Sequence, residues 1–189
     1  MLTILPPNEE TIERLNQPDA RFLAGEMVQV RVTRKGFLPE YIPLGTAQWR
    51  QHPVSSLVTR ETLRQHDDWA CFFAFLEDRF VGQLAAAPEE FGLCKLLDIR
   101  VDSSHRRQGV GTGLLNACVD WALKKGRKGV AAEVSDENPV ACQFFQSQGF
   151  TLGGVDKLRH FADPRQAEKP AALRDSVLTF YRFFDGVKR

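Results

Sequence analysis

Residues 70–124 constrain the fold more than any other stretch of the chain. Two β-type runs, ACFFAFLE and FVGQLAAA, flank the polar pair Asp78-Arg79, a pattern typical of a tight hairpin turn. After a second turn at residues 88–92, the run LCKLLDIRV predicts a third strand. A polar loop and an amphipathic segment follow. This order predicts a three-stranded antiparallel meander that leads through a short loop into a helix.

Two helices are expected in the second half of the chain. In the first, TGLLNACVDWALKKG, apolar side chains recur at helical spacing and cover one face: Leu114, Leu115, Cys118, Trp121 and Ala122. In the second, NPVACQFFQSQG, Asn138 is the expected N-cap, Pro139 takes the first helical position and Gly149 closes the helix. The short run VAAEV between them predicts a strand.

The remaining segments give weaker signals. Strands are expected over residues 27–33, from residue 150 and in the final run VLTFYRFF, and short helical stretches over residues 8–16 and 60–66. Pro39 and Pro43 indicate a loop or broken strand over residues 36–45, and residues 163–175 indicate a polar linker. The predicted fold class is α/β (α+β), with a mixed, mostly antiparallel sheet flanked by helices.

Composition narrows the function classes. The 189 residues fit one domain over 1–189, and 25 Lys+Arg against 24 Asp+Glu leave a formal charge of +1. That balance argues against salt-driven binding to nucleic acid or to an anionic membrane. The four cysteines form no CxxC motif and lie far from the histidines, so no metal is expected and the thiols are expected to be reduced. Without a signal peptide or a membrane span in the sequence, we expect a cytoplasmic location.

The segment Arg106-Arg107-Gln108-Gly109-Val110-Gly111-Thr112 carries the strongest chemical signal. A strand, a basic glycine loop and a helix start together expose backbone N–H groups to an anion, and the helix dipole adds positive potential. The alternative is a tight turn with solvated arginines. A P-loop is excluded because no Gly-Lys-Ser/Thr occurs, and a dinucleotide fingerprint is excluded because Leu114 stands at the third glycine position.

This loop resembles the R-x-x-G-x-G loop of the GNAT superfamily of N-acetyltransferases, which cradles the pyrophosphate of acetyl-CoA. The segment NPVACQFFQSQGF also resembles the family's N-x-x-A-x-x-F-Y-x-x-x-G-F segment, and the resemblance covers about residues 70–155. The run NPVACQFFQSQGFTLGGVD and the aromatic final strand are similar to the streptothricin acetyltransferase group of this family.

The resemblance implies a set of acetyl-CoA contacts. The strand residues Ile99, Arg100 and Val101 would present backbone groups to the pantetheine arm and the carbonyl. The pyrophosphate would be held by the loop residues Arg106, Arg107, Gln108, Gly109, Val110, Gly111 and Thr112. Asn138 would contact the arm, and Phe144 and Phe145 would pack beside it, unless these two rings belong to the core.

Acetyl transfer needs a base for the amine and an acid for the leaving thiolate. Glu133, a charge within the apolar run VAAEV, is the first candidate base and Asp98 the second, unless either is a solvated charge at a strand edge. Many family members place a tyrosine acid where this chain has Phe145, which donates no proton. Tyr181, a water molecule, or unassisted departure of the thiolate would then replace it.

The expected function is acetyl-CoA-dependent acetylation of a primary amine on a small molecule, such as a streptothricin-type antibiotic. Acids in predicted loops would steer a cationic amine, unless they are solvated surface: Asp67, Asp68, Glu89, Glu90, Asp136 and Glu137. The N-terminal third would shape the acceptor side. The alternatives are a protein N-terminal or lysine acetyltransferase and a non-catalytic acyl-CoA-binding module; a monomer or a homodimer is expected.

Overall fold

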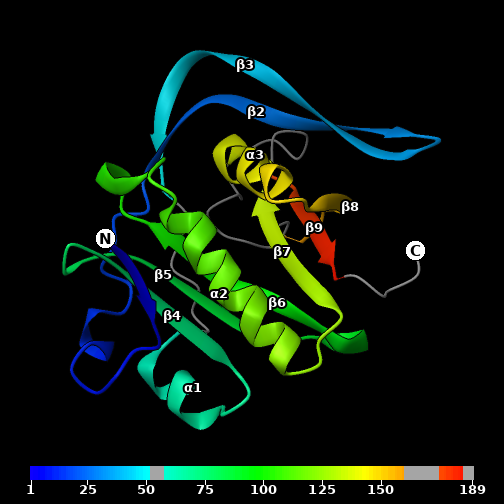
Figure 1. Cartoon of the computed structure of the whole chain (residues 1–189). Helices are drawn as coiled ribbons and strands as arrows, with labels where there is room; N and C mark the ends of the chain where they lie inside the picture. Colours follow the sequence, from blue (N-terminus) through cyan, green and yellow to red (C-terminus); the bar gives the residue numbers. More distant parts are fainter. Residues whose placement is uncertain (52–57, 160–174, 185–189) are drawn as a thin grey trace. The chain divides into compact units, whose positions relative to one another are not determined.

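The computed structural model describes residues 1–51, 58–159 and 175–184 (Figure 1). The chain divides into two compact units. Unit 1 comprises Met1–Arg21, Gln51–Val130 and Phe183–Arg189, and unit 2 comprises Phe22–Arg50 and Ala131–Arg182.

The strands of unit 1 form an antiparallel array in the order β1-β4-β5-β6. Their bounds are β1 (Leu2–Leu5), β4 (Ala70–Leu76), β5 (Arg79–Pro88) and β6 (Leu93–Val101). Glu77 and Asp78 both have positive φ angles, 49° and 65°, as a type I′ hairpin turn requires. The predicted meander is therefore confirmed, but its first turn lies one residue earlier than the predicted pair Asp78-Arg79, because Leu76 pairs with Arg79. Strand β1, which pairs with the edge of β4, was not predicted because four residues are too short for an alternation signal.

Helix α2 (Val110–Lys124) packs on this array (Figure 1). Its buried face contains the predicted positions Leu114, Leu115, Cys118 and Ala122, whereas Trp121 is half-buried. Gly82 on β5 permits the close approach, because a Cβ there would lie 3.2 Å from side-chain atoms of both Leu114 and Val110. The helix ends before Gly126, whose φ of 68° fits the predicted C-terminal cap.

Two short helical segments of unit 1 precede β4 in the chain. Helix α1 (Arg60–Gln65) confirms the helical turns expected there, and Thr59 caps it by accepting a hydrogen bond from the Thr62 N–H. The helix expected over residues 8–16 is only the 3₁₀ turn η1 (Ile12–Arg14). Asn8 and Thr11 hydrogen-bond to each other there and form a local turn that competes with a longer helix.

Unit 2 contains strands in the order β7-β9-β8 and helix α3. The bounds are β7 (Gly129–Ser135, entering unit 2 at Ala131), α3 (Pro139–Ser147), β8 (Thr151–Asp156) and β9 (Val177–Phe183). The α3 residue Phe145 is 3% exposed and packs against Phe150 and against Phe180 of β9, with ring centroids 5.1 and 6.2 Å apart. The predicted strand, helix and final strand are confirmed.

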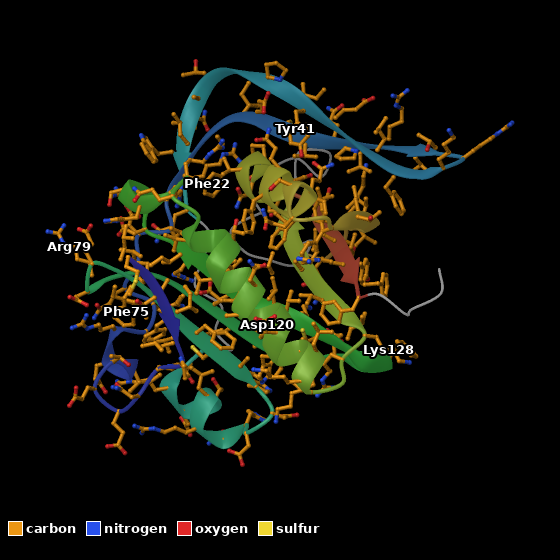
Figure 2. All side chains as sticks on the ribbon, in the orientation of Figure 1. Phe22, Tyr41, Phe75, Arg79, Asp120 and Lys128 are labelled. Carbon is orange, nitrogen blue, oxygen red and sulfur yellow. The ribbon has the colours of Figure 1, made fainter. Side chains whose placement is uncertain are left out.

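A long hairpin also belongs to unit 2. Strand β2 (Phe22–Thr33) pairs with β3 (Gly36–Arg50), so a loop over residues 36–45 is wrong. The broken-strand alternative holds in part, because the pairing passes from Pro43 to Gln48 with a shift of register. Pro39 and Pro43 fit because a two-stranded ribbon leaves each strand one edge that needs no N–H donor. Tyr41 of β3 points to α3 and donates its hydroxyl to Gln146 (Figure 2).

Three further expectations concern the polar linker, the cysteines and membrane-spanning helices. Of the linker expected over residues 163–175, all but Asp175 lies outside the described residues. All four cysteines are free thiols; Cys94, Cys118 and Cys142 are buried, and Cys71 is half-buried. None of the helices in the described part of the chain is long and apolar enough to cross a membrane.

Candidate active site

The loop before α2 has the backbone of an anion site. Arg107 and Gly109 adopt left-handed conformations, with φ angles of 62° and 80°, and Gly109 is the N-cap of α2. No side chain caps the helix start, so the N–H groups of Val110, Gly111 and Thr112 remain available at its positive end. Val110 itself is 1% exposed and contributes only backbone to this site.

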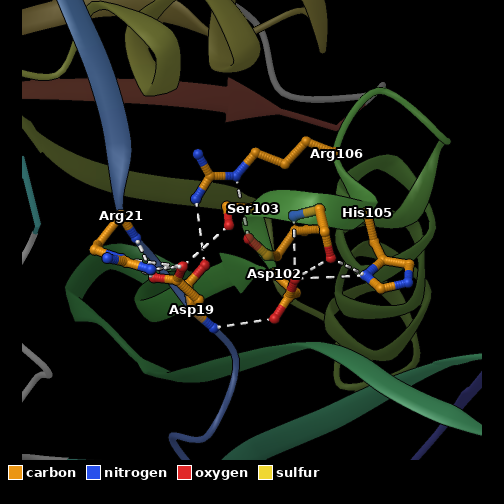
Figure 3. Close-up of polar contacts among 8 residues, drawn as sticks. Asp19, Arg21, Asp102, Ser103, His105 and Arg106 are labelled. Carbon is orange, nitrogen blue, oxygen red and sulfur yellow. Dashed lines mark hydrogen bonds and ion pairs between the residues drawn. The ribbon is translucent and has the colours of Figure 1, made fainter. Parts of the chain in front are cut away.

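Arg106 holds the loop to its surroundings in unit 1 (Figure 3). Its Nε donates to the carbonyl of Val101 at the end of β6 over 3.1 Å, and its Nη2 to the carbonyl of Asp19 over 3.5 Å. Arg107, in contrast, is exposed. The two adjacent arginines cannot be distinguished in the sequence, but they differ in the structure. Arg106 holds the loop through hydrogen bonds, and Arg107 is exposed to solvent.

Two carboxylates complete this frame (Figure 3). Asp19 receives the Arg21 guanidinium and the Ser103 hydroxyl, and the hydrogen bonds from Arg21 hold the pKa of Asp19 well below its ordinary value. Burial works to raise the pKa of Asp102, but hydrogen bonds from Ser104 and His105 lower it on balance. Both carboxylates are thus ionised acceptors that fix the turn leading into the loop.

Asp98, the second candidate base, lies in a buried polar network of unit 1. The guanidinium of Arg100 binds both carboxylate oxygens of Asp98, with a shortest distance of 2.6 Å, and the Gln83 amide donates to Asp98 over 2.7 Å. Gln83 also exchanges two hydrogen bonds with Asn16. Because the Asp98 and Arg100 side chains are only 10% and 4% exposed, this pair is a structural anchor whose carboxylate oxygens are already engaged.

Glu133, the first candidate base, is accessible. It is the exposed residue of β7 between the buried Ala132 and Val134, and its Oε2 lies 3.5 Å from Nη2 of Arg159. Both side chains are partly in water, 31% exposed for Glu133 and 53% for Arg159. A loose, solvated ion pair of this kind leaves the carboxylate able to exchange partners.

Six loop acids were expected to steer a cation, and five of them lie where they contact solvent or an arginine. Asp67, Asp68, Glu89 and Glu90 are exposed, as the solvated-surface alternative requires. Glu137 pairs with Arg50 at the end of β3 over 2.6 Å.

Asp136 is buried, which the sequence did not indicate. The residue is 8% exposed, and its Oδ1 has no hydrogen-bond partner among the described residues. Burial, with Asp175 and Glu137 nearby, raises its pKa to about 6. Asp136 is thus a carboxyl group that gives up its proton near neutral pH.

The remaining predicted site residues of unit 2 are one helix cap and three aromatic residues. Asn138 caps α3 as predicted: its Oδ1 accepts from the Ala141 N–H over 3.0 Å, which leaves its amide NH₂ as a donor. Phe145 lies in the aromatic core cluster, and the core alternative describes it; Phe144 is half-buried at its edge, 5.3 Å from Phe145 between ring centroids. Tyr181 of β9 is half-buried, and its ring lies against Gly153 of β8.

Sequence reasoning missed three of these features: the Arg159 partner of Glu133, the buried state of Asp136, and the contact between Gly153 and Tyr181. Each depends on pairing between strands or on residues distant in sequence, so local patterns carry no signal for them. The glycine pair at 153–154 within a strand was the one visible indication, because an interior glycine suggests a bulge or a close approach. Among residues 1–51, 58–159 and 175–184, no three His, Cys, Asp or Glu side chains are grouped as metal ligands.

The fold combines an antiparallel meander with a loop between β6 and α2 whose helix start has no side-chain cap. The chain belongs to the acetyltransferase (GNAT) family, whose sequence model matches residues 36–150. It is therefore an N-acetyltransferase that uses acetyl-CoA.

Curated relatives agree with this assignment, and a solved structure shares the fold. A streptothricin acetyltransferase from Escherichia coli is 26% identical over 170 residues, 90% of this chain and 91% of that protein. Streptothricin acetyltransferase A from Bacillus subtilis is 29% identical over 114 residues, 60% of this chain and 62% of that protein. A structure from Bacillus anthracis, assigned as a streptothricin acetyltransferase in complex with acetyl coenzyme A, shares the fold with a TM-score of 0.85 and 19% identity, covering 97% of this chain and 100% of that one.

Proposed function

We propose that this enzyme acetylates a primary amine of a small cationic molecule of the streptothricin type. The observation that carries the proposal is the alignment with the Escherichia coli streptothricin acetyltransferase, which extends over 90% of this chain. That extent includes most of the N-terminal third, which is expected to shape the acceptor side. A monomer or homodimer in the cytoplasm, without nucleic-acid or membrane partners, remains part of this proposal.

Acetyl-CoA would bind through the backbone of the loop. The N–H groups of Gly111 and Thr112 at the start of α2 would receive the pyrophosphate, and Arg107 would add a positive charge from solvent. Ile99 and Val101 on β6 would offer backbone groups to the arm. The amide NH₂ that Asn138 retains after capping α3 would donate to the arm as well.

Glu133 would act as the base. An amine with a pKa near ~10 is mostly protonated at neutral pH and must lose a proton before its nitrogen can attack the thioester carbonyl. Glu133 suits this step better than Asp98, because Arg100 and Gln83 already occupy the oxygens of Asp98. As the C–S bond breaks, the electron pair goes to sulfur and a proton must reach the thiolate. Phe145 supplies none, and Tyr181 is the candidate donor.

The test is thiol release from acetyl-CoA with a panel of amines: a streptothricin, a polyamine, free lysine and peptides with free N-termini. We expect turnover with the streptothricin, and mass spectrometry should show one added acetyl group on its β-lysine amine. Turnover with peptides alone would instead favour a protein acetyltransferase. Acetyl-CoA binding with no turnover for every amine would favour a binding module and contradict the proposal.

A further inference from the structure

The β8–β9 pair contains an irregularity at Gly153. Leu152 pairs with Phe180, but the next pair joins Gly154 to Thr179, so Gly153 is an extra residue without a partner in the ladder. A bulge of this kind redirects neighbouring side chains and occurs often beside active sites. Here an aromatic ring, that of Tyr181, lies against the extra residue.

The Tyr181 ring lies directly on Gly153. A Cβ atom at residue 153 would stand 2.6 Å from Cδ2 and 2.9 Å from Cε2 of Tyr181, closer than any real contact allows. The φ angle of Gly153 lies outside the left-handed region, so its backbone would accept an L-amino acid. The ring, and not the backbone, is therefore what requires glycine at this position.

The adjacent glycine provides a contrast within the same strand. A Cβ at Gly154 would lie 3.7 Å from the Cβ of Thr179, which is an ordinary van der Waals contact. Gly154 could therefore carry a methyl group without moving its neighbours. Only one glycine of this pair is matched to an aromatic ring.

Strand alternation places Tyr181 on a definite face of unit 2. Phe180 stacks on Phe145 of α3, so Tyr181, the next residue, points to the face of the sheet away from α3. Strand β9 lies between β8, which carries Gly153, and β7, which carries Glu133. Tyr181 therefore lies on the strand next to the one that carries Glu133, the candidate base.

We propose that Gly153 is a positioning residue that fixes the Tyr181 phenol for protonation of the leaving thiolate. The inference rests on the proposed function. When the C–S bond breaks, sulfur keeps the bonding electron pair and takes the proton of Tyr181 Oη, and the phenolate regains a proton from solvent. A side chain at residue 153 displaces the ring and therefore the donor, while binding of acetyl-CoA at the loop of unit 1 is left intact.

The experiment compares four variants in steady-state acetylation of the best amine: Gly153→Ala, Gly154→Ala, Tyr181→Phe and the double variant Gly153→Ala/Tyr181→Phe. Tyr181→Phe should lower kcat about 10²-fold, the loss typical of a missing general acid. Gly153→Ala should lower kcat about 10-fold or more, because small displacements of a catalytic group are costly. The KM for acetyl-CoA should stay unchanged in both, and Gly154→Ala should remain within about 2-fold of wild type.

Two readouts separate positioning from a purely structural role. The alkaline limb of the pH profile of kcat, which reports an acid that must be protonated, should disappear in Tyr181→Phe and shift in Gly153→Ala. In the Tyr181→Phe background, Gly153→Ala should cause no further loss, since the donor is already absent. Thermal unfolding of each variant identifies any that fail to fold.

The inference is overturned if Gly153→Ala behaves like Gly154→Ala, or if its loss in kcat is the same with and without the Tyr181 hydroxyl. Either result, in an enzyme whose wild type turns over, leaves the proposed function standing. A wild type that acetylates no amine overturns both.

Discussion

The two units place charge in different ways. Unit 1 buries the carboxylate of Asp98 against the guanidinium of Arg100 and neutralises it. Its loop then offers an anion uncapped backbone N–H groups at a helix start. Unit 2 leaves Glu133 in a loose, solvated pair and buries Asp136 with an oxygen that has no partner among the described residues. Unit 1 thus presents a neutralised ion pair and an uncapped helix start, and unit 2 presents an exposed carboxylate and a buried one.

The largest effect on this comparison is expected from removing the exposed carboxylate of unit 2, that of Glu133. Glu133→Gln should lower kcat by about 10²–10⁴-fold and leave the KM for acetyl-CoA unchanged, because a base acts in the transition state and not in cofactor binding. In the pH profile of the initial rate, the fall at low pH should disappear. Glu40→Gln, which removes a carboxylate paired with Arg31 on the exposed hairpin, is the matched control. An unchanged pH profile in Glu133→Gln would remove it as the base.

The corresponding change in unit 1 is Gly111→Glu. A negative side chain at the first turn of α2 would stand where the pyrophosphate is expected, and we predict that the dissociation constant for acetyl-CoA rises by at least ~10², the effect of several kcal/mol of like-charge repulsion. Isothermal titration calorimetry gives this value directly. Asn116→Glu adds the same charge at an exposed position further along α2 and should bind normally. If Gly111→Glu binds acetyl-CoA as wild type does, the cofactor does not use this loop.

The same contrast explains what could be predicted from the sequence. The meander, α2 and α3 were correctly predicted because turn residues, helical spacing and the Asn138-Pro139 cap are local signals. The glycine turn before α2 was visible for the same reason, since it depends on consecutive backbone groups; its role in binding acetyl-CoA stays a prediction. The full strand β3 was not predicted from the sequence. Pro39 and Pro43 disfavour a strand locally, and only the pairing with β2 outweighs that effect.

Side-chain roles were less predictable. Asp98 and Glu133 look alike in sequence, as single acids in apolar strands, yet one is bound by Arg100 and the other is accessible. Asp136 looks like a solvated loop acid and is buried. Its backbone is held by residues distant in sequence: its N–H donates to the carbonyl of Ser176, and its carbonyl accepts from the N–H of Val28 in β2. Partners distant in sequence decide each case.

Asp98→Asn sharpens the comparison between the two carboxylates. Removing the negative charge leaves the Arg100 guanidinium buried without its counter-ion, and we expect a loss of about 3 kcal/mol in the free energy of unfolding, measured by urea titration. Replacing both residues, as Asp98→Asn/Arg100→Met, should recover part of that loss, since no buried charge remains. The kcat of the folded protein and the acidic limb of its pH profile should stay the same. A lost acidic limb in Asp98→Asn would assign the base to Asp98 instead of Glu133.

The smallest expected effect concerns Asp136. Its pKa of about 6 in the folded chain lies above the ordinary value near 3.8, so folding favours the protonated form, and the contribution is fully present below pH 3.8 and lost as the pH rises through 6. Asp136→Asn mimics the protonated group. It should therefore match wild type near pH 4 and be more stable above pH 6, by about 1–3 kcal/mol.

Urea unfolding of wild type and Asp136→Asn at pH 4, 5, 6 and 7 measures this difference. Asp120→Asn, an exposed position on α2, should show no such trend, because its side chain is in water in both the folded and the unfolded state (Figure 2). An Asp136→Asn variant that is less stable than wild type at pH 7 would mean that the ionised carboxylate is stabilised in the folded protein. Asp136 would then have a cationic partner, as Asp98 does, and the contrast between the two units would be lost.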